Sequence, residues 1–224
     1  MNGLNKLFLD SASISDAELC IKRGLINGVT TNPSLFSKQP KCDFTEHCKS
    51  LADVCDGLPL SVEVFCADPN EMYDSALKLI DTIDYENLNV KVPVGFDELL
   101  AVKKLSARGV DVNVTCCFTL EQMMLAAKSG ARYVSLFYNR AKDCGLDVTQ
   151  ILQDFNSFLY STDLSCTVET ISGSIRKPAD VTAAWQAGSH IVTASTEIIQ
   201  QMTQHEGTTK STDQFLKDFD EWLK

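Results

Sequence analysis

The segment LNVKVPVGFDELLAVKKLSARGVDVNVT, residues 88–115, combines a short apolar run, an amphipathic stretch and a second short apolar run. The valine-rich runs at 88–94 and 111–118 are typical of buried strands, and the stretch at 95–109 is typical of a helix packed by one face. Short strands that alternate with helices indicate a parallel sheet, because the helix returns the chain to the start of the next strand.

The same alternation repeats along the whole chain. We expect strands at 6–10, 28–32, 60–65, 88–94, 111–118, 132–140, 166–174 and 190–194, and helices at 15–24, 43–55, 68–81, 95–109, 119–130, 147–159, 178–188 and 195–202. A final amphipathic helix is expected at about 212–223. Eight strand–helix units in 224 residues predict an α/β fold, a single (β/α)8 TIM barrel with an additional C-terminal helix, forming one catalytic domain over residues 1–224. A doubly wound open sheet is the alternative, but its glycine fingerprint for dinucleotides is missing after the first strand, which continues LDSASIS.

Composition narrows the classes of partner. The formal net charge of −10 argues against nonspecific binding to nucleic acid or to an anionic membrane. No apolar run approaches the roughly 18 residues that a membrane span needs, and residues 1–10 are too polar for a signal peptide. The nine cysteines are scattered without a CxxC pair, and the three histidines are far apart, so we expect reduced thiols, a cytoplasmic location and no metal or other cofactor.

Lys91 stands between Val90 and Val92 in the middle of an expected buried strand. A lysine is seldom buried unless it is paired or used in chemistry. Side chains alternate across a strand, so the valines should pack on the helices and Lys91 should point into the barrel.

The same alternation places further polar side chains in the barrel interior. The inward set is Asp10, Asn32, Glu63, Lys91, Asn113, Thr115 and Ser135; Thr30 shares the face of Asn32, Phe65 that of Glu63, and Phe137 that of Ser135. All lie near the carboxyl ends of their strands, where barrel enzymes build their sites. We therefore predict one site at this end of the barrel, rather than separate structural polar residues.

An enclosed lysine can act as a fixed cation, or as an amine that forms a Schiff base with a carbonyl compound. The second use requires the neutral amine. Valine neighbours disfavour the ammonium form, whereas ionised Asp10 and Glu63 would favour it, so the sequence leaves the balance open. Asp10, Glu63 and a water held by Thr115 could supply the proton transfers that Schiff-base formation needs.

A second group of residues follows the sixth and seventh expected strands. The stretches YNRAKD (138–143) and SGSIRKP (172–178) place Arg140, Ser174 and Arg176 at the mouth of the barrel. Two guanidinium groups and a hydroxyl suit a phosphate dianion. Surface salt bridges made by the arginines are the alternative.

The chain resembles the transaldolase family, in particular its short-chain branch. The matching stretches occur in the family's order: LFLDSA, GVTTNPSL, SVEVF, VKVPV, VNVTCCF, YVSLFYNR and GSIRKP. The resemblance implies that Lys91 forms the Schiff base, that Asp10 is the general acid/base, and that Glu63 and Thr115 hold a catalytic water. It further implies that Asn32 and Asn113 bind the dihydroxyacetone hydroxyls with Ser135 nearby, and that Arg140, Ser174 and Arg176 bind phosphate.

The implied reaction moves a dihydroxyacetone unit from sedoheptulose 7-phosphate to glyceraldehyde 3-phosphate, in the pentose phosphate pathway. The similar fructose-6-phosphate aldolases release dihydroxyacetone and carry Gln and Tyr at the positions of Glu63 and Phe137, so this chain has the transferase pattern. A non-catalytic sugar-phosphate-binding barrel and an aldolase of deoxyribose phosphate type are further alternatives. The chain departs from the family at Leu136, where proline is usual, and at Tyr138-Asn139, which replace a glycine-containing turn; the cysteine pair at 116–117 is also unusual. The resemblance implies a homo-oligomer, a pentamer or a decamer.

Overall fold

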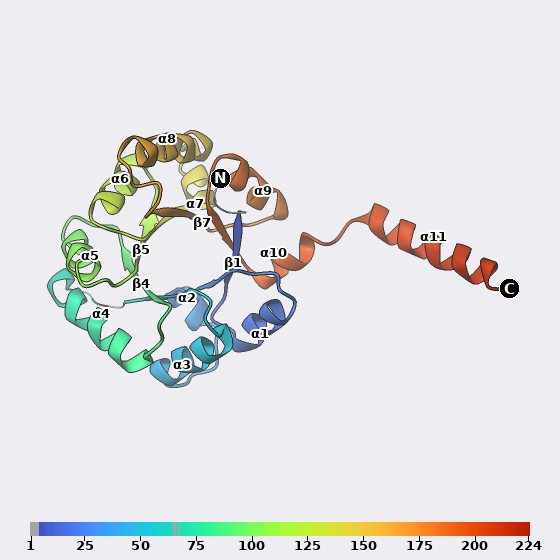
Figure 1. Ribbon diagram of the computed structural model, residues 1–224, viewed down its shortest axis with the longest axis horizontal. Helices are drawn as coiled ribbons and strands as arrows, with labels where there is room; N and C mark the ends of the chain where they lie inside the picture. The colour runs from blue at the N-terminus through green and yellow to red at the C-terminus, as the bar shows by residue number, and fades with distance from the viewer. Residues whose placement is uncertain (1–4, 65, 67) are drawn as a thin grey trace.

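A closed barrel of eight parallel strands forms the centre of the protein (Figure 1). The computed structural model describes residues 5–64, 66 and 68–224. The strands follow one another in chain order, and the first strand pairs with both the second and the eighth, which closes the barrel. The predicted TIM barrel is confirmed, and the open-sheet alternative is wrong.

The elements alternate as the sequence predicts. The strands are β1 (Lys6–Asp10), β2 (Val29–Thr30), β3 (Leu60–Glu63), β4 (Leu88–Pro93), β5 (Val112–Cys117), β6 (Tyr133–Phe137), β7 (Glu169–Gly173) and β8 (Ile191–Ala194). The helices are α1 (Ile14–Lys22), α2 (Pro33–Phe36), α3 (Phe44–Cys55), α4 (Pro69–Ile83), α5 (Glu98–Ser106), α6 (Leu120–Lys128), α7 (Tyr138–Asp143), α8 (Val148–Ser161), α9 (Pro178–Gln186), α10 (Thr196–Gln201) and α11 (Glu206–Trp222). None of the helices in the described part of the chain has the length and apolar character that a membrane crossing requires.

Two short helices replace segments that the sequence analysis assigned to strands or left unassigned. The sixth strand was expected to reach residue 140, but β6 ends at Phe137, its last pairing with β7, and α7 begins at Tyr138. The unexpected helix α2 begins directly after Asn32, whose Oδ1 accepts the N–H of Leu35 at 3.1 Å, and Pro33 occupies the first helical position. An asparagine cap followed by proline is a strong start signal for a helix. The expected inward position of Phe65 lies outside the described residues.

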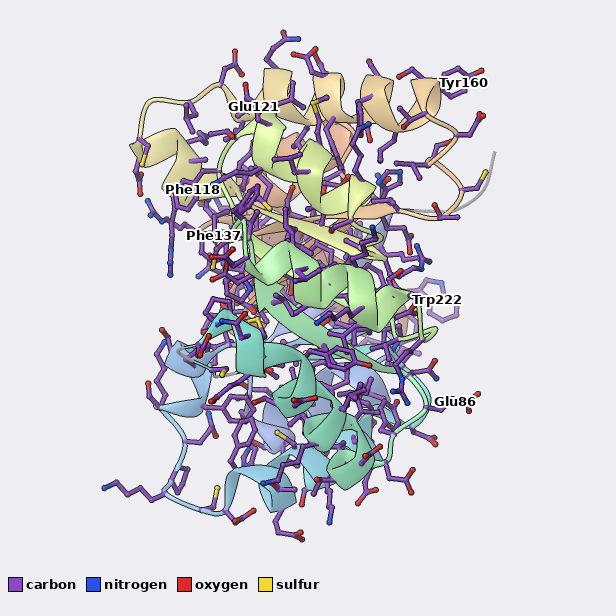
Figure 2. All side chains as sticks on the ribbon, turned by 90° about the vertical axis from the view of Figure 1, so that its left-hand side faces the viewer. Glu86, Phe118, Glu121, Phe137, Tyr160 and Trp222 are labelled. Atoms are coloured by element: carbon purple, nitrogen blue, oxygen red, sulfur yellow. The ribbon has the colours of Figure 1, made fainter. Side chains whose placement is uncertain are left out.

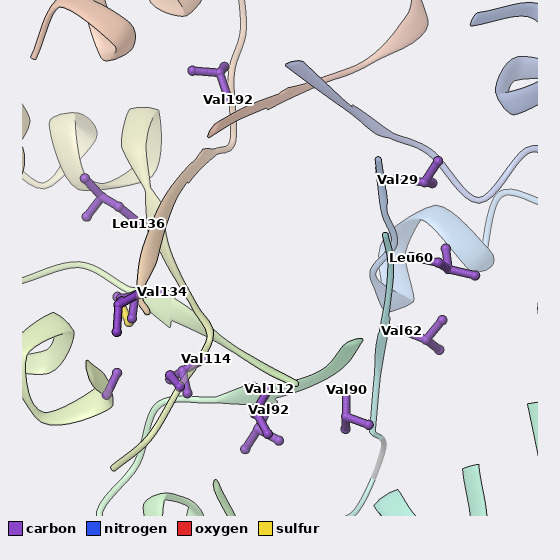
Figure 3. Packing of buried hydrophobic residues seen from close by; sticks show 14 of the residues in the cluster. Val29, Leu60, Val62, Val90, Val92, Val112, Val114, Val134, Leu136 and Val192 are labelled. Atoms are coloured by element: carbon purple, nitrogen blue, oxygen red, sulfur yellow. The ribbon is translucent and has the colours of Figure 1, made fainter. Parts of the chain in front are cut away.

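The main apolar core lies between the strands and the surrounding helices. Val62, Val90, Val92 and Val114 are completely buried there, and Figure 3 shows them pointing away from the barrel axis. A second, smaller cluster fills the barrel interior and consists of Phe8, Tyr133, Ile171 and Ile191. Tyr133 and Ile191 open their strands, so this cluster closes the amino-terminal end of the barrel and leaves the carboxyl end for polar residues.

The interior cluster predicts a sensitive position at Gly28, because a Cβ atom added there would lie 2.6 Å from the Phe8 ring. Gly28→Ala should lower the free energy of unfolding by about 1–3 kcal/mol, since overpacking forces neighbours from their preferred positions. Urea titration followed by circular dichroism measures this. Gly173→Ala is the control, because its added Cβ would meet Thr193 at an ordinary 3.5 Å. Combining Gly28→Ala with Phe8→Leu should cost less than the sum of the two changes, and strict additivity would contradict the proposed clash.

Candidate functional site

A cavity of about 230 Å³ opens at the carboxyl ends of the strands. Ten of the residues predicted for the site line it: Asp10, Thr30, Asn32, Glu63, Lys91, Thr115, Ser135, Phe137, Arg140 and Ser174. They come from seven of the strands or from the segments that directly follow them, including α7. The other two predicted residues, Asn113 and Arg176, do not line the cavity.

Lys91 points into the barrel as the alternation predicts and is only 6% exposed. Its amine donates a hydrogen bond of 2.7 Å to the backbone carbonyl of Thr31 and lies 3.7 Å from Oε2 of Glu63. The carbonyl is itself fixed, because the hydroxyl and the backbone N–H of Thr31 both donate to the carbonyl of Ser61. The amine is therefore held at one point of the cavity wall beside a carboxylate.

Two carboxyl groups share the cavity with this amine. Burial raises the pKa of Asp10, while the charge of Lys91 and a hydrogen bond of 2.9 Å from the Thr30 hydroxyl oppose the rise. Burial likewise raises the pKa of Glu63, and Lys91 again opposes it. A carboxyl group with a raised pKa binds a proton more readily than an ordinary one, which suits general acid–base chemistry.

Thr30 also connects Asp10 to a residue that the sequence analysis missed. The hydroxyl of Thr193, in β8, lies 2.6 Å from that of Thr30, so a chain of hydrogen bonds runs from Thr193 through Thr30 to Asp10. Thr193 follows Ile191 at an interval of two, and Ile191 also faces the interior. Extending the alternation argument to the eighth strand would have found it.

Thr115 lies on β5 and lines the cavity. Its side chain is buried, and its hydroxyl has no hydrogen-bond partner among the described residues. A buried hydroxyl without a partner is costly, and here it faces a cavity where a bound molecule can satisfy it. The next residue, Cys116, also lines the cavity and has a left-handed backbone (φ 61°) at the irregular pairing between β5 and β6. Sequence reasoning did not assign Cys116 to the site, although two adjacent cysteines at 116–117 are unusual and were a signal.

Asn113 lies beneath the cavity rather than in its wall. Its Oδ1 accepts a hydrogen bond of 2.7 Å from the Ser135 hydroxyl, and its Nδ2 donates to the Ser61 hydroxyl at 3.2 Å. In this arrangement Asn113 fixes the orientation of Ser135, which does line the cavity.

The two predicted phosphate arginines have different surroundings. Arg140 lines the cavity, and its guanidinium lies over the ring of Phe137 at 4.7 Å. Phe118 contacts the same ring edge-on with centroids 5.8 Å apart, and Figure 2 shows the two aromatic residues side by side. Arg176 is exposed and forms a two-pronged ion pair with Asp143 of α7, as the salt-bridge alternative anticipated. Ser174, between these loops, lines the cavity and has a left-handed backbone (φ 59°).

Fold and cavity together define a (β/α)8 barrel with a buried lysine and two carboxyl groups at the carboxyl end of its strands. The profile of the Transaldolase/Fructose-6-phosphate aldolase family matches residues 7–223, and the chain belongs to this family.

Curated relatives match almost the whole chain, and a solved structure shares its fold. A "Probable transaldolase" of Thermoanaerobacter sp. (strain X514) is 36% identical over 214 residues, covering 96% of each chain. One of Clostridioides difficile (strain 630) is 37% identical over 218 residues, covering 96% of this chain and 97% of the relative. A thiamine phosphate pyrophosphorylase from Pyrococcus furiosus superposes with a TM-score of 0.59 over 98% of both chains at 14% identity, which shows a likeness of fold alone.

The unpaired hydroxyl of Thr115 leads to a prediction about stability. Thr115→Val removes a hydroxyl that no described residue satisfies, so the free energy of unfolding should stay the same or rise by up to about 1 kcal/mol. Thr31→Val is the matched control, since the Thr31 hydroxyl donates at 2.8 Å to the Ser61 carbonyl, and its loss should cost about 1–2 kcal/mol. Urea denaturation of both variants makes the comparison. Equal destabilisation by the two changes would show that Thr115 has a partner inside the protein.

Proposed function

We propose that this protein is a transaldolase that moves a dihydroxyacetone unit from sedoheptulose 7-phosphate to glyceraldehyde 3-phosphate, giving erythrose 4-phosphate and fructose 6-phosphate. The observation that carries the proposal is the Lys91 amine, enclosed at the cavity wall between carboxyl groups. Membership of the transaldolase/fructose-6-phosphate aldolase family supports it. Residues 1–224 then act as one catalytic domain, without a metal or other cofactor, in the cytoplasmic pentose phosphate pathway.

The first step joins the ketose to Lys91. The neutral amine attacks the ketose carbonyl carbon, the resulting carbinolamine loses water, and an iminium ion forms. The carbonyl of Thr31 holds the nitrogen in place. A carboxyl group is needed to protonate the departing hydroxyl, and Glu63, 3.7 Å from the amine, is in position through the water that it would hold with Thr115.

The second step breaks the carbon–carbon bond. Asp10 removes the proton from the hydroxyl on C4, the C3–C4 bond breaks, and its electron pair moves into the iminium to form an enamine. The aldehyde product departs. An acceptor aldehyde then takes its place, the enamine attacks it, and Asp10 returns the proton to the new alkoxide. Water finally adds to the iminium that has re-formed, the bond to the Lys91 nitrogen breaks, and fructose 6-phosphate and the free amine are released. The pKa of Asp10, raised by burial, suits a group that must both take and return a proton.

Binding of the sugar phosphate uses both ends of the cavity. Oδ1 of Asn32 accepts the hydrogen bond that caps α2, so its amide NH₂ group can donate to a dihydroxyacetone hydroxyl. Ser135 lies on the opposite wall of the cavity. Arg140 and Ser174 would bind the phosphate, and Arg176 would join them by exchanging Asp143 for the substrate.

The ring of Phe137 favours transfer over release. A phenyl ring at the cavity wall has no hydroxyl that could protonate the enamine, so the intermediate survives until an acceptor arrives. Release of free dihydroxyacetone, as in a fructose-6-phosphate aldolase, is the alternative.

The C-terminal helix supports a homo-oligomer. Every residue of α11 is exposed, and the helix extends away from the barrel (Figure 1). Phe215, Phe219 and Trp222 lie at helical spacing on it, and the last two rings stack with centroids 5.9 Å apart. Aromatic surface of this kind is normally covered. We propose that it packs on a second copy of this chain in a pentamer or a decamer.

The Schiff-base proposal is tested by reduction with borohydride in the presence of fructose 6-phosphate. Peptide mapping by mass spectrometry should find the reduced adduct on Lys91 and none in Lys91→Met. Lys103→Met, which removes an exposed lysine of α5, is the matched control and should keep the adduct. An adduct found only on Lys103 or Lys104 would refute the proposal. Fructose 6-phosphate should then yield product at least about tenfold faster with an acceptor aldehyde than without one; equal rates would favour the aldolase.

The role of α11 is tested by sedimentation velocity. Replacing Phe215, Phe219 and Trp222 by serine should reduce the assembly to smaller species, because it removes the apolar surface that the second copy covers. The control is a triple change at the charged residues Lys210, Lys217 and Asp218 of the same helix, which should leave the assembly unchanged. An unaltered protein that sediments as a monomer would contradict the proposal.

A further inference from the structure

One buried carboxylate connects helix α7, which carries Arg140, to the loop before α9, which carries Arg176. Nδ2 of Asn139 donates a hydrogen bond of 2.8 Å to Oδ2 of Asp180, and the backbone N–H of Arg176 points at the same oxygen at 3.4 Å. Asn139 directly precedes Arg140, while Asp180 lies in the first turn of α9, four residues after Arg176. A single oxygen atom therefore receives donors from both segments.

The burial of this pair is not explained by contact with the cavity. Asp180 is 3% exposed and Asn139 is 7% exposed, yet neither lines the cavity. Burying a carboxylate is costly unless hydrogen bonds satisfy it. Here the partners are the Asn139 amide and the Arg176 N–H, together with the positive end of α9. The side chain of Asp180 thus joins the start of α9 to α7.

We propose that Asn139 and Asp180 are positioning residues for recognition of the substrate phosphate. Their hydrogen bond fixes the distance between the backbone at Arg140 and the loop of Ser174 and Arg176, so that the cation and the hydroxyl meet one anion. This inference rests on the proposed function, since it concerns the phosphate end of the same cavity.

Two further contacts make the bond decisive for Arg140. The guanidinium of Arg140 lies over the Phe137 ring, so the stacking sets the plane of the group while Asn139 fixes the backbone from which it extends. The second link between these segments, the Arg176–Asp143 ion pair, is exposed and screened by water, and it must open if Arg176 is to reach a phosphate. Beyond the β6–β7 ladder, which ends at Phe137 and Gly173, the buried bond is then the side-chain connection that persists while substrate binds.

The sequence around Asn139 fits this role. Asn139 directly precedes Arg140, and its amide bonds across to Asp180 of α9. At the start of α9 the residue Lys177 makes no side-chain cap bond, and the Asp180 carboxylate accepts both the Asn139 amide and the Arg176 N–H.

The test compares Asn139→Ala, Asp180→Ala, the double variant and the conservative Asp180→Asn, which keeps an acceptor oxygen. We expect each alanine change to raise KM for fructose 6-phosphate and the inhibition constant of inorganic phosphate roughly fivefold to tenfold, the equivalent of one hydrogen bond, with kcat within about twofold. The double variant should be no worse than either single change, because both remove the same bond. Asp180→Asn should remain close to the unaltered protein.

The controls separate positioning from stability. Asn156→Ala removes another asparagine bond, from Nδ2 to the Gly188 carbonyl at 2.8 Å beside the amino-terminal end of β8, and should leave phosphate inhibition unchanged. The rise in melting temperature caused by added inorganic phosphate gives a second readout, and it should shrink in Asn139→Ala and Asp180→Ala but not in Asn156→Ala. Should Asp180→Ala fail to fold, Asn139→Ala and Asp180→Asn decide the matter through both readouts.

Unchanged phosphate inhibition in folded Asn139→Ala would overturn the inference, as would an equal loss of affinity for dihydroxyacetone without phosphate. The amount of adduct that borohydride traps on Lys91 with dihydroxyacetone separates this failure from that of the proposed function. No adduct in the unaltered protein refutes the Schiff-base chemistry, whereas a normal adduct with unchanged phosphate inhibition refutes only the role of Asn139 and Asp180.

Discussion

The cation enclosed at Lys91 is the constraint on which the cavity depends. Its amine bonds to the Thr31 carbonyl and faces Glu63, and its charge opposes the rise in pKa that burial causes in both Glu63 and Asp10. Without this charge, both carboxyl groups would lose the largest electrostatic effect that opposes the rise in their pKa. The charge of Lys91 therefore lowers the cost of placing two buried carboxyl groups in one small cavity.

Much of the fold and the cavity follows from a single physical rule. Each strand buries one face against helices, so the apolar residues reveal that face and the polar residues between them must enter the barrel. Val90 and Val92 lie outside and Lys91 inside for this reason. The rule also located Glu63 and Thr115, because the alternation on their strands is regular up to these residues and breaks on β5 only at Cys116. It needed no knowledge of the distances between strands.

The rule fails where strands end, since local bonds then decide the course of the chain. The side chain of Asn32 turns the backbone into α2. The pairing of β6 with β7 ends at Phe137, and the chain then forms α7 instead of continuing as a strand. The partner of Arg176 is Asp143, which is 33 residues away in the sequence, and no periodic pattern reports such a pair. The part of the cavity near Arg140 and Ser174 was accordingly the least accessible to sequence reasoning.

The strands divide the apolar interior into an outer layer, packed on helices, and a small cluster around Phe8 inside the barrel. The packing that stabilises the barrel lies mainly in the outer layer, and none of its residues lines the cavity. Side chains at the carboxyl end can hence be replaced with little loss of stability. Evolution of this fold can therefore change the substrate by a few substitutions at inward positions, without first requiring a mutation that stabilises the protein.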